Sequence, residues 1–328
     1  MLVEAEDYRT EYVIDACQYA NWDRAIFKQM NEGGVTCVNA TIAYWESARE
    51  TLTRLAEWRE LFTTNADLIL PAYSSSDIHR AKKEGRTAIT LAFQHCSPIE
   101  EEIGLVEIMY DLGVRFMQLS YNNQSPLASG WMEIEDGGIT RFGREVIREM
   151  NRLGLVIDMS HSAERSTLDT IELSERPIAI THANPMSWCN TRRNKSDTVL
   201  QKLAESDGML GFSLYPNHLK DGPDTTLDAF CDMVAYTADL IGTGNIGIGS
   251  DLVQGQPDWV VEWMRNGKWL RKTQKNLSWP APTNWFRNNS DFPAISTALV
   301  KKGFAKEEVD KIMGGNWLRF MESAFRPG

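Results

Sequence analysis

The sequence predicts an α/β fold, a TIM-type (β/α)8 barrel, on three observations. Eight short runs rich in apolar and β-branched residues alternate with longer amphipathic segments along the 328-residue chain. Most of these runs lack the alternation of a half-exposed strand, and continuous apolarity is typical of strands buried on both faces of a parallel sheet. The runs recur over roughly 250 residues, which is the usual size of such a barrel.

The eight runs define the predicted strands in chain order. They are Tyr12–Cys17, Val35–Thr41, Ala88–Gln94, Val114–Tyr121, Leu155–His161, Ile178–His182, Met209–Leu214 and Ile246–Asp251. Amphipathic patterns over Ile99–Leu112 and Arg144–Leu153 predict helices between strands, the second ending at Gly154 as a C-cap. A doubly wound nucleotide-binding sheet is the rival fold, but no GxGxxG or GxxxxGK[ST] pattern follows the first run.

Two segments interrupt the repeat within what we predict to be one domain spanning residues 1–328. Residues 43–86 have a helical pattern between the second and third strands. Residues 252–290 follow the eighth strand, and we expect them to form a lid or pocket wall, or to pack the insertion or a subunit interface. This second insertion contains five of the eleven tryptophans: Trp259, Trp263, Trp269, Trp279 and Trp285.

Composition narrows the classes of partner. A net charge of −11 and a pI of about 5.1 disfavour nucleic acid and anionic membranes. No apolar run approaches the ~18 residues of a membrane span, and the first residues lack the features of a signal peptide. Five widely spaced cysteines without a CxxC pattern favour a reduced, cytoplasmic protein over a disulfide framework.

Three predicted strands end in side chains that can bind a metal. His161, His182 and Asp251 stand at the carboxyl ends of their runs, where a barrel keeps its chemistry. Such residues suggest a metal-assisted hydrolase. A single polar residue at a strand end is more often a core or loop residue whose hydrogen bonds are made within the protein. Three such residues at the ends of three strands weigh against that interpretation. His79 and His218 have no supporting pattern.

Several segments together resemble the membrane dipeptidase family (renal dipeptidase, metallopeptidase M19). They are DMSHSA (158–163), ITHANP (180–185), TRRN (191–194), GIGSD (247–251) and MGGNWLRFM (313–321). The match runs in order from about Tyr12 to Phe320. The resemblance implies a TIM barrel, a zinc centre, hydrolysis of short amide substrates and commonly a homodimer.

The resemblance also assigns roles to four residues. His161 and His182 match the family's two zinc-binding histidines. Arg193 matches the arginine that holds the substrate carboxylate, a task suited to a guanidinium fork. Asp251 matches the aspartate near the attacking water and the amino end of the substrate.

Four other positions depart from the family pattern. Cys17 and Tyr19 replace the histidine and aspartate of its HxD pair, Gln94 replaces the bridging glutamate, and Tyr121 replaces a histidine that stabilises the oxyanion. Gln94 is neutral, and the unperturbed pKa of a tyrosine is ~10, so binding of two metals is weakened. Cys17 is either a thiolate ligand or a small core residue.

Two functions remain open at this point. The first is a zinc-dependent amidohydrolase acting on a small carboxylate-bearing amide or dipeptide, with one zinc held by His161, His182 and either Gln94 or Asp251. In it Asp251 is the general base, and Tyr121 binds substrate and donates a hydrogen bond to the oxyanion. The second is a metal-free or catalytically altered barrel for a small polar metabolite, which amides such as Gln94 would bind.

Overall fold

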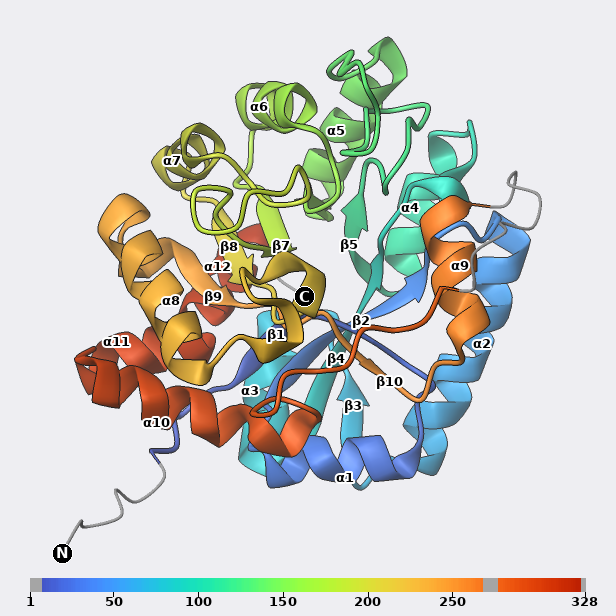
Figure 1. Ribbon diagram of the computed structural model, residues 1–328. Coiled ribbons are helices and arrows are strands. Elements are labelled where there is room, and N and C mark those ends of the chain that lie inside the picture. The colour runs from blue at the N-terminus through green and yellow to red at the C-terminus, as the bar shows by residue number, and fades with distance from the viewer. Residues whose placement is uncertain (1–7, 268–276, 326–328) are drawn as a thin grey trace, which may run out of the picture.

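The computed structural model, which describes residues 8–267 and 277–325, is a closed parallel barrel (Figure 1). The predicted TIM barrel is therefore confirmed. Its eight strands are β1 (Ile14–Ala20), β2 (Cys37–Ala43), β4 (Thr87–Phe93), β5 (Val114–Gln118), β6 (Val156–Asp158), β7 (Ala179–Ala183), β8 (Met209–Phe212) and β9 (Ile246–Ile248). Each pairs in parallel with its neighbours, and Asp15 of β1 opposite Ile248 of β9 closes the ring.

Helices surround the barrel, most of them in an outer ring (Figure 1). They are α1 (Arg24–Glu32), α2 (Ala48–Thr64), α3 (Ser75–Glu84), α4 (Gly104–Asp111), α5 (Arg141–Leu153), α6 (Glu164–Leu173), α7 (Asp197–Glu205), α8 (Leu227–Ile241), α9 (Asp258–Asn266), α10 (Phe292–Lys302), α11 (Lys306–Asp310) and α12 (Asn316–Ala324). Helix α5 begins where the Thr140 hydroxyl accepts the Gly143 N–H at 2.9 Å, and it ends at Gly154 with φ +76°. A hydroxyl-bearing N-cap residue and a C-terminal glycine with positive φ are common at the two ends of a helix.

Helix α12 packs against the amino ends of the strands. A hydrophobic cluster joins its residues to the first residues of several strands, including Ile14, Cys37 and Met209. The Trp317 indole donates to the Ile248 carbonyl at 3.0 Å, and a Cβ at Gly247 would lie 2.5 Å from Trp317 Nε1. The opposite, carboxyl ends of the strands are therefore the ones left for a functional site.

The first insertion contains more than the predicted helices. Between α2 and α3 lies β3 (Ile69–Pro71), which pairs with β4 outside the ring. Three residues are too few for a period to be seen in the sequence. The amphipathic run Ile99–Leu112 is also interrupted, because a 3-10 turn over Ser97–Ile99 precedes α4.

The second insertion adds β10 (Leu252–Gln254), which pairs with the end of β1, and helix α9. Trp45 anchors α9 by donating to the Met264 carbonyl at 3.0 Å. The structure describes four of the five tryptophans of the second insertion. Trp259 is 67% exposed, and Trp279 lines a cavity. Trp263 packs on Tyr44, and Trp285 packs on Phe230. Trp269 lies outside the described residues. Among described helices, none has the length and apolarity to cross a membrane.

Candidate active site

The three polar strand ends meet at the carboxyl rim of the barrel. His182 lies within β7, His161 follows β6, and Asp251 follows β9. The Nε2 atoms of His161 and His182 are 3.0 Å apart. Ligand atoms of Cys17, His182 and Asp251 all lie within 4.8 Å of one another. The fold thus gathers three potential metal ligands from β1, β7 and the end of β9, and it places His161, after β6, next to His182.

The hydrogen bonds around His161 define which ring nitrogen carries the proton. Asn122 Oδ1 accepts the Trp131 indole N–H at 2.8 Å and lies 2.9 Å from His161 Nδ1. An indole nitrogen only donates, so the Asn122 atom that it meets is the oxygen. His161 Nδ1 must then be the donor, which leaves a lone pair on Nε2.

A second chain of hydrogen bonds determines which ring nitrogen of His182 carries the proton. The buried Asp158 carboxylate accepts the hydroxyl groups of Ser160 at 2.5 Å and Thr181 at 2.6 Å. The Thr181 proton is thereby used, so Thr181 Oγ1 accepts from His182 Nδ1 at 2.8 Å. His182 Nε2 also carries a lone pair, and a carboxylate stands behind the ring, as is common for metal-binding histidines.

These two lone pairs face each other in a buried space. Burial, with the nearby Arg193 cation, lowers the pKa of both His161 and His182 well below the usual value, so both rings are neutral near pH 7. Facing lone pairs repel unless a cation lies between them. Zinc–nitrogen bonds of 2.0–2.1 Å in a tetrahedron separate two nitrogens by about 3.3 Å. The observed 3.0 Å is close to that value, so the residues present fit a metal ion.

The side chains of Gln94 and Tyr19 are not arranged as metal ligands. The Gln94 amide nitrogen, rather than its oxygen, faces Cys17 Sγ at 3.3 Å, and it also donates to Thr41 Oγ1 at 2.9 Å and to Tyr44 OH at 3.2 Å. Tyr19 packs edge-to-face on Tyr44 with ring centroids 5.0 Å apart, and burial raises its pKa to about 12. Neither side chain supplies the charge that a second metal would need.

Asp251 has a strained backbone and a perturbed carboxyl. Its φ is +56°, a left-handed conformation that is rare for a residue other than glycine, and such strain often occurs at active sites. Its N–H donates to the Cys17 carbonyl at 2.9 Å. Burial raises the pKa of Asp251 to about 7, against the opposing effect of Arg193.

Arg193 supports the two histidines from behind. Its Nη1 donates to the Ser160 carbonyl at 2.7 Å and its Nη2 to the His182 carbonyl at 2.9 Å, while its buried Nε has no protein partner. Arg193 therefore holds the two histidine-bearing strand ends and keeps further N–H groups available. Tyr121 stacks on His161 with ring centroids 4.0 Å apart, and burial keeps its phenol protonated by raising its pKa.

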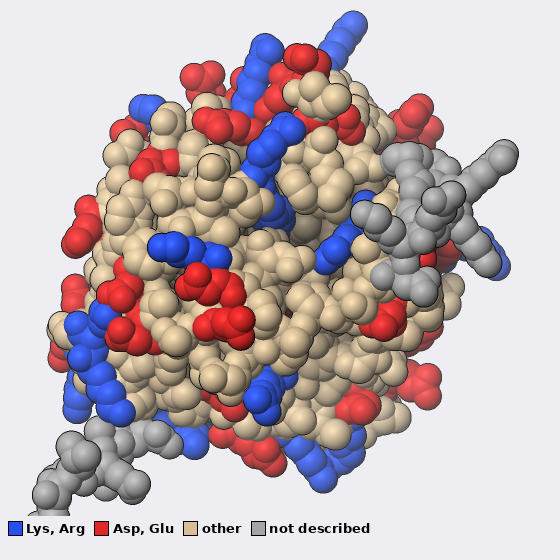
Figure 2. Space-filling model, viewed as in Figure 1, with Lys and Arg blue, Asp and Glu red and all other residues tan. Residues whose placement is uncertain are grey.

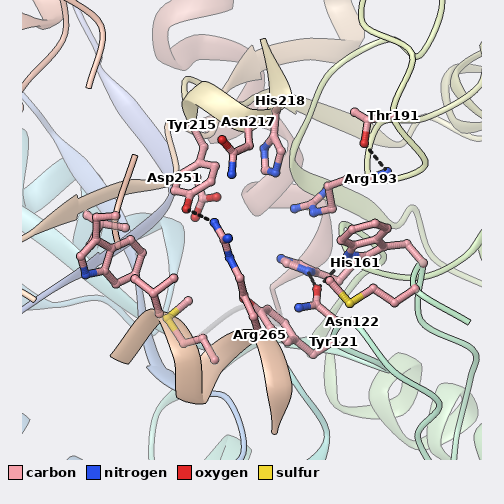
Figure 3. Close-up of a pocket in the computed structure, with 16 residues that line it drawn as sticks. Tyr121, Asn122, His161, Thr191, Arg193, Tyr215, Asn217, His218, Asp251 and Arg265 are labelled. Atoms are coloured by element: carbon pink, nitrogen blue, oxygen red, sulfur yellow. Dashed lines mark hydrogen bonds between the residues drawn. The ribbon is translucent and has the colours of Figure 1, made fainter. Parts of the chain in front are cut away.

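A cavity of about 200 Å³ opens beside these residues (Figure 3). The predicted residues Tyr121, His161, Arg193 and Asp251 all line it, whereas His182 and Gln94 do not. Pockets for drug-sized ligands usually measure ~300–1,000 Å³, so this cavity suits a small substrate. In the same view as Figure 1, Figure 2 shows this face hollowed near its centre, with Lys and Arg side chains beside the hollow.

The cavity also has lining residues that the sequence did not identify. His218 contacts Ser213 Oγ through Nδ1 at 2.7 Å, and Arg265 of α9 donates to Tyr215 OH at 3.0 Å (Figure 3). Within the described part of the chain, Arg265 has no carboxylate partner within 4.0 Å. No pattern in the sequence supported a role for His218, and its place shortly after the predicted seventh strand is the one feature that could have indicated it. Nothing in the sequence placed Arg265 opposite Asp251.

Comparisons with known proteins bear on this site. The sequence matches the model of the membrane dipeptidase family (peptidase family M19) over residues 16–270. It is 25% identical to dipeptidase aclJ of Aspergillus oryzae over 283 residues, which are 84% of this chain and 61% of that protein. The chain therefore spans less than two thirds of that relative's length.

Solved structures extend the comparison to the fold. An amidohydrolase from Pseudomonas aeruginosa is 34% identical, with a TM-score of 0.89 and 96% of both chains covered. A metallopeptidase from Rhodobacter sphaeroides, bound to a phosphinate mimic of the dipeptide L-Ala-D-Ala, is 16% identical. Its TM-score is 0.81, with 97% of this chain and 100% of that one covered, which shows a shared fold.

Proposed function

Because this chain belongs to the membrane dipeptidase family, peptidase family M19, we propose that it is an amidohydrolase that cleaves a small carboxylate-bearing amide or dipeptide with one zinc ion. The observation that carries the proposal is the pair of neutral imidazole nitrogens 3.0 Å apart beside Asp251. A second function, a metal-free barrel that binds a small polar metabolite, draws support from the neutral Gln94 and Tyr19. This second function does not explain the two facing lone pairs, because it places no cation between them.

Each residue has a task in the proposed reaction. Zinc at His161 and His182 would acidify a water molecule and polarise the scissile carbonyl. Asp251, the strand-end carboxylate beside these ligands, takes the proton from the attacking water and passes it to the leaving amine.

The cavity wall positions the substrate. Arg193 presents N–H groups to the substrate carboxylate from the buried side, and Arg265 adds a second cation from α9. Holding the carboxylate in one place converts the attack into an effectively intramolecular step. Tyr121 donates a hydrogen bond to the oxyanion, because burial keeps its phenol protonated.

Elemental analysis, combined with a substrate panel, tests the proposal. Protein purified without chelator should contain close to one zinc per chain, and it should hydrolyse one or more members of a panel of dipeptides and N-acyl amino acids. Asp251→Asn should abolish turnover while retaining the metal. A folded protein that takes up no zinc and hydrolyses nothing when zinc is added would support the metal-free function instead. Light scattering on the same sample tests the homodimer that we propose from the family resemblance.

A further inference from the structure

We propose that the Cys17 thiolate is the third protein ligand of the metal that His161 and His182 hold. The inference rests on the proposed function, since it requires that a metal binds. It assigns a chemical task to a residue that is otherwise a buried cysteine in a barrel strand. It also gives the place of third ligand to Cys17 rather than to Gln94.

The backbone places Cys17 beside the other ligands. Cys17 lies in β1, between β2 and β9, and its carbonyl accepts the Asp251 N–H at 2.9 Å. Its Sγ is 3.8 Å from Asp251 Oδ1, and both belong to the group with His182 whose ligand atoms lie within 4.8 Å. His182 Nε2, which lies 3.0 Å from His161 Nε2, links this group to the second histidine.

The charges around the thiol also favour a cation. Two carboxylates contact Cys17: Asp15 Oδ1 accepts its backbone N–H at 3.4 Å, and Asp251 Oδ1 lies 3.8 Å from its Sγ. A bare thiolate at this place would face both desolvation and like charge. A divalent cation makes the thiolate the favoured form, because a coordinated thiol loses its proton to solvent as the metal–sulfur bond forms.

Gln94 then becomes a positioning residue. Its amide nitrogen lies 3.3 Å from Cys17 Sγ, and one of its two N–H groups can point to the thiolate in place of Tyr44 OH. Thr41 Oγ1 lies 3.9 Å from the same sulfur and adds a weaker contact. Three protein ligands leave a fourth position open, as in catalytic zinc sites. With Cys17, His161 and His182 as ligands, Asp251 stays free to act on water at that position.

Cobalt substitution of the intact chain tests this ligand set directly. Co²⁺ bound to a thiolate gives an intense charge-transfer absorption in the near ultraviolet, which nitrogen and oxygen ligands do not give. We expect the wild type to bind one Co²⁺ with this band. Cys17→Ser should lose the band and bind Zn²⁺ at least about tenfold more weakly, since even outer-shell partners of a metal contribute that much.

Cys37→Ser is the matched control. Cys37 is equally buried on the neighbouring strand β2, but it belongs to the cluster at the amino end of the barrel. This variant should keep both the band and the zinc affinity. X-ray absorption on the cobalt-loaded wild type adds a measurement that needs no variant, and it should show one sulfur neighbour.

The outcomes separate the two proposals. Cobalt bound without the charge-transfer band or a sulfur neighbour would overturn the role of Cys17 and leave the proposed hydrolase intact. A folded wild type that binds neither Co²⁺ nor Zn²⁺ would overturn the proposed function itself. If Cys17→Ser fails to fold, the wild-type sulfur neighbour still decides the question.

Discussion

Replacing Thr181 with valine should weaken zinc binding without changing any metal ligand. Valine has nearly the shape of threonine, so the packing of β7 is kept. The change removes the hydroxyl that donates to Asp158 at 2.6 Å and accepts from His182 Nδ1 at 2.8 Å. His182 then loses the partner that holds its proton on Nδ1 and its lone pair toward His161.

The expected size follows from these contacts. Loss of an outer-shell partner usually lowers metal affinity by about 10–100-fold, or roughly 1.4–2.8 kcal/mol. Thr181→Val should therefore raise the Kd for Zn²⁺ by one to two orders of magnitude. The lost hydrogen bond to a buried carboxylate should also lower the free energy of unfolding by about 1.5–3 kcal/mol.

Competition with a chromophoric chelator measures the Kd, and urea unfolding measures stability. Thr90→Val is a suitable control, because Thr90 is a buried barrel threonine whose hydroxyl donates to Asn39 Oδ1 at 2.9 Å rather than to a site residue. The control should lose stability and keep its zinc affinity. A folded Thr181→Val with wild-type affinity would refute the relay from Asp158 to His182.

Three further predictions follow from other parts of the barrel. Burial lowers the pKa of Lys195 from 10.5 to about 7. Between these two pH values the unfolded chain binds more protons than the folded one, so Lys195 makes the free energy of unfolding rise by about 2 kcal/mol from pH 7 to pH 9. Urea unfolding of Lys195→Met at both pH values should show a smaller rise. Arg265→Gln should raise KM for carboxylate-bearing substrates by about 10–100-fold with little change in kcat, whereas Arg265→Lys should restore part of the binding; equal KM values in all three proteins would exclude Arg265 from the substrate site. Gly247→Ala should destabilise the fold by about 1–3 kcal/mol, because its Cβ would meet the Trp317 indole at 2.5 Å, and an unchanged Tm would contradict that packing.

The barrel and the strand ends could be predicted because their signals are local. Continuous apolar runs mark strands buried on both faces, and a polar residue after such a run must lie at the carboxyl rim. His161, His182 and Asp251 were found in this way. The short strand β3 escaped because three residues carry no period, and its place is decided by pairing with β4.

The sequence by itself therefore determined the fold class and the family, and it predicted residues that the structure brings together at the carboxyl rim. Only the tertiary structure decided how they act. The proton positions on His161 and His182 depend on Asn122 and Thr181, and the approach of Cys17 to Asp251 joins strands more than 200 residues apart in the sequence. Arg265 enters the site because α9 is anchored on Trp45. Such distances and hydrogen-bond directions arise when the barrel closes, so no local pattern in the chain encodes them.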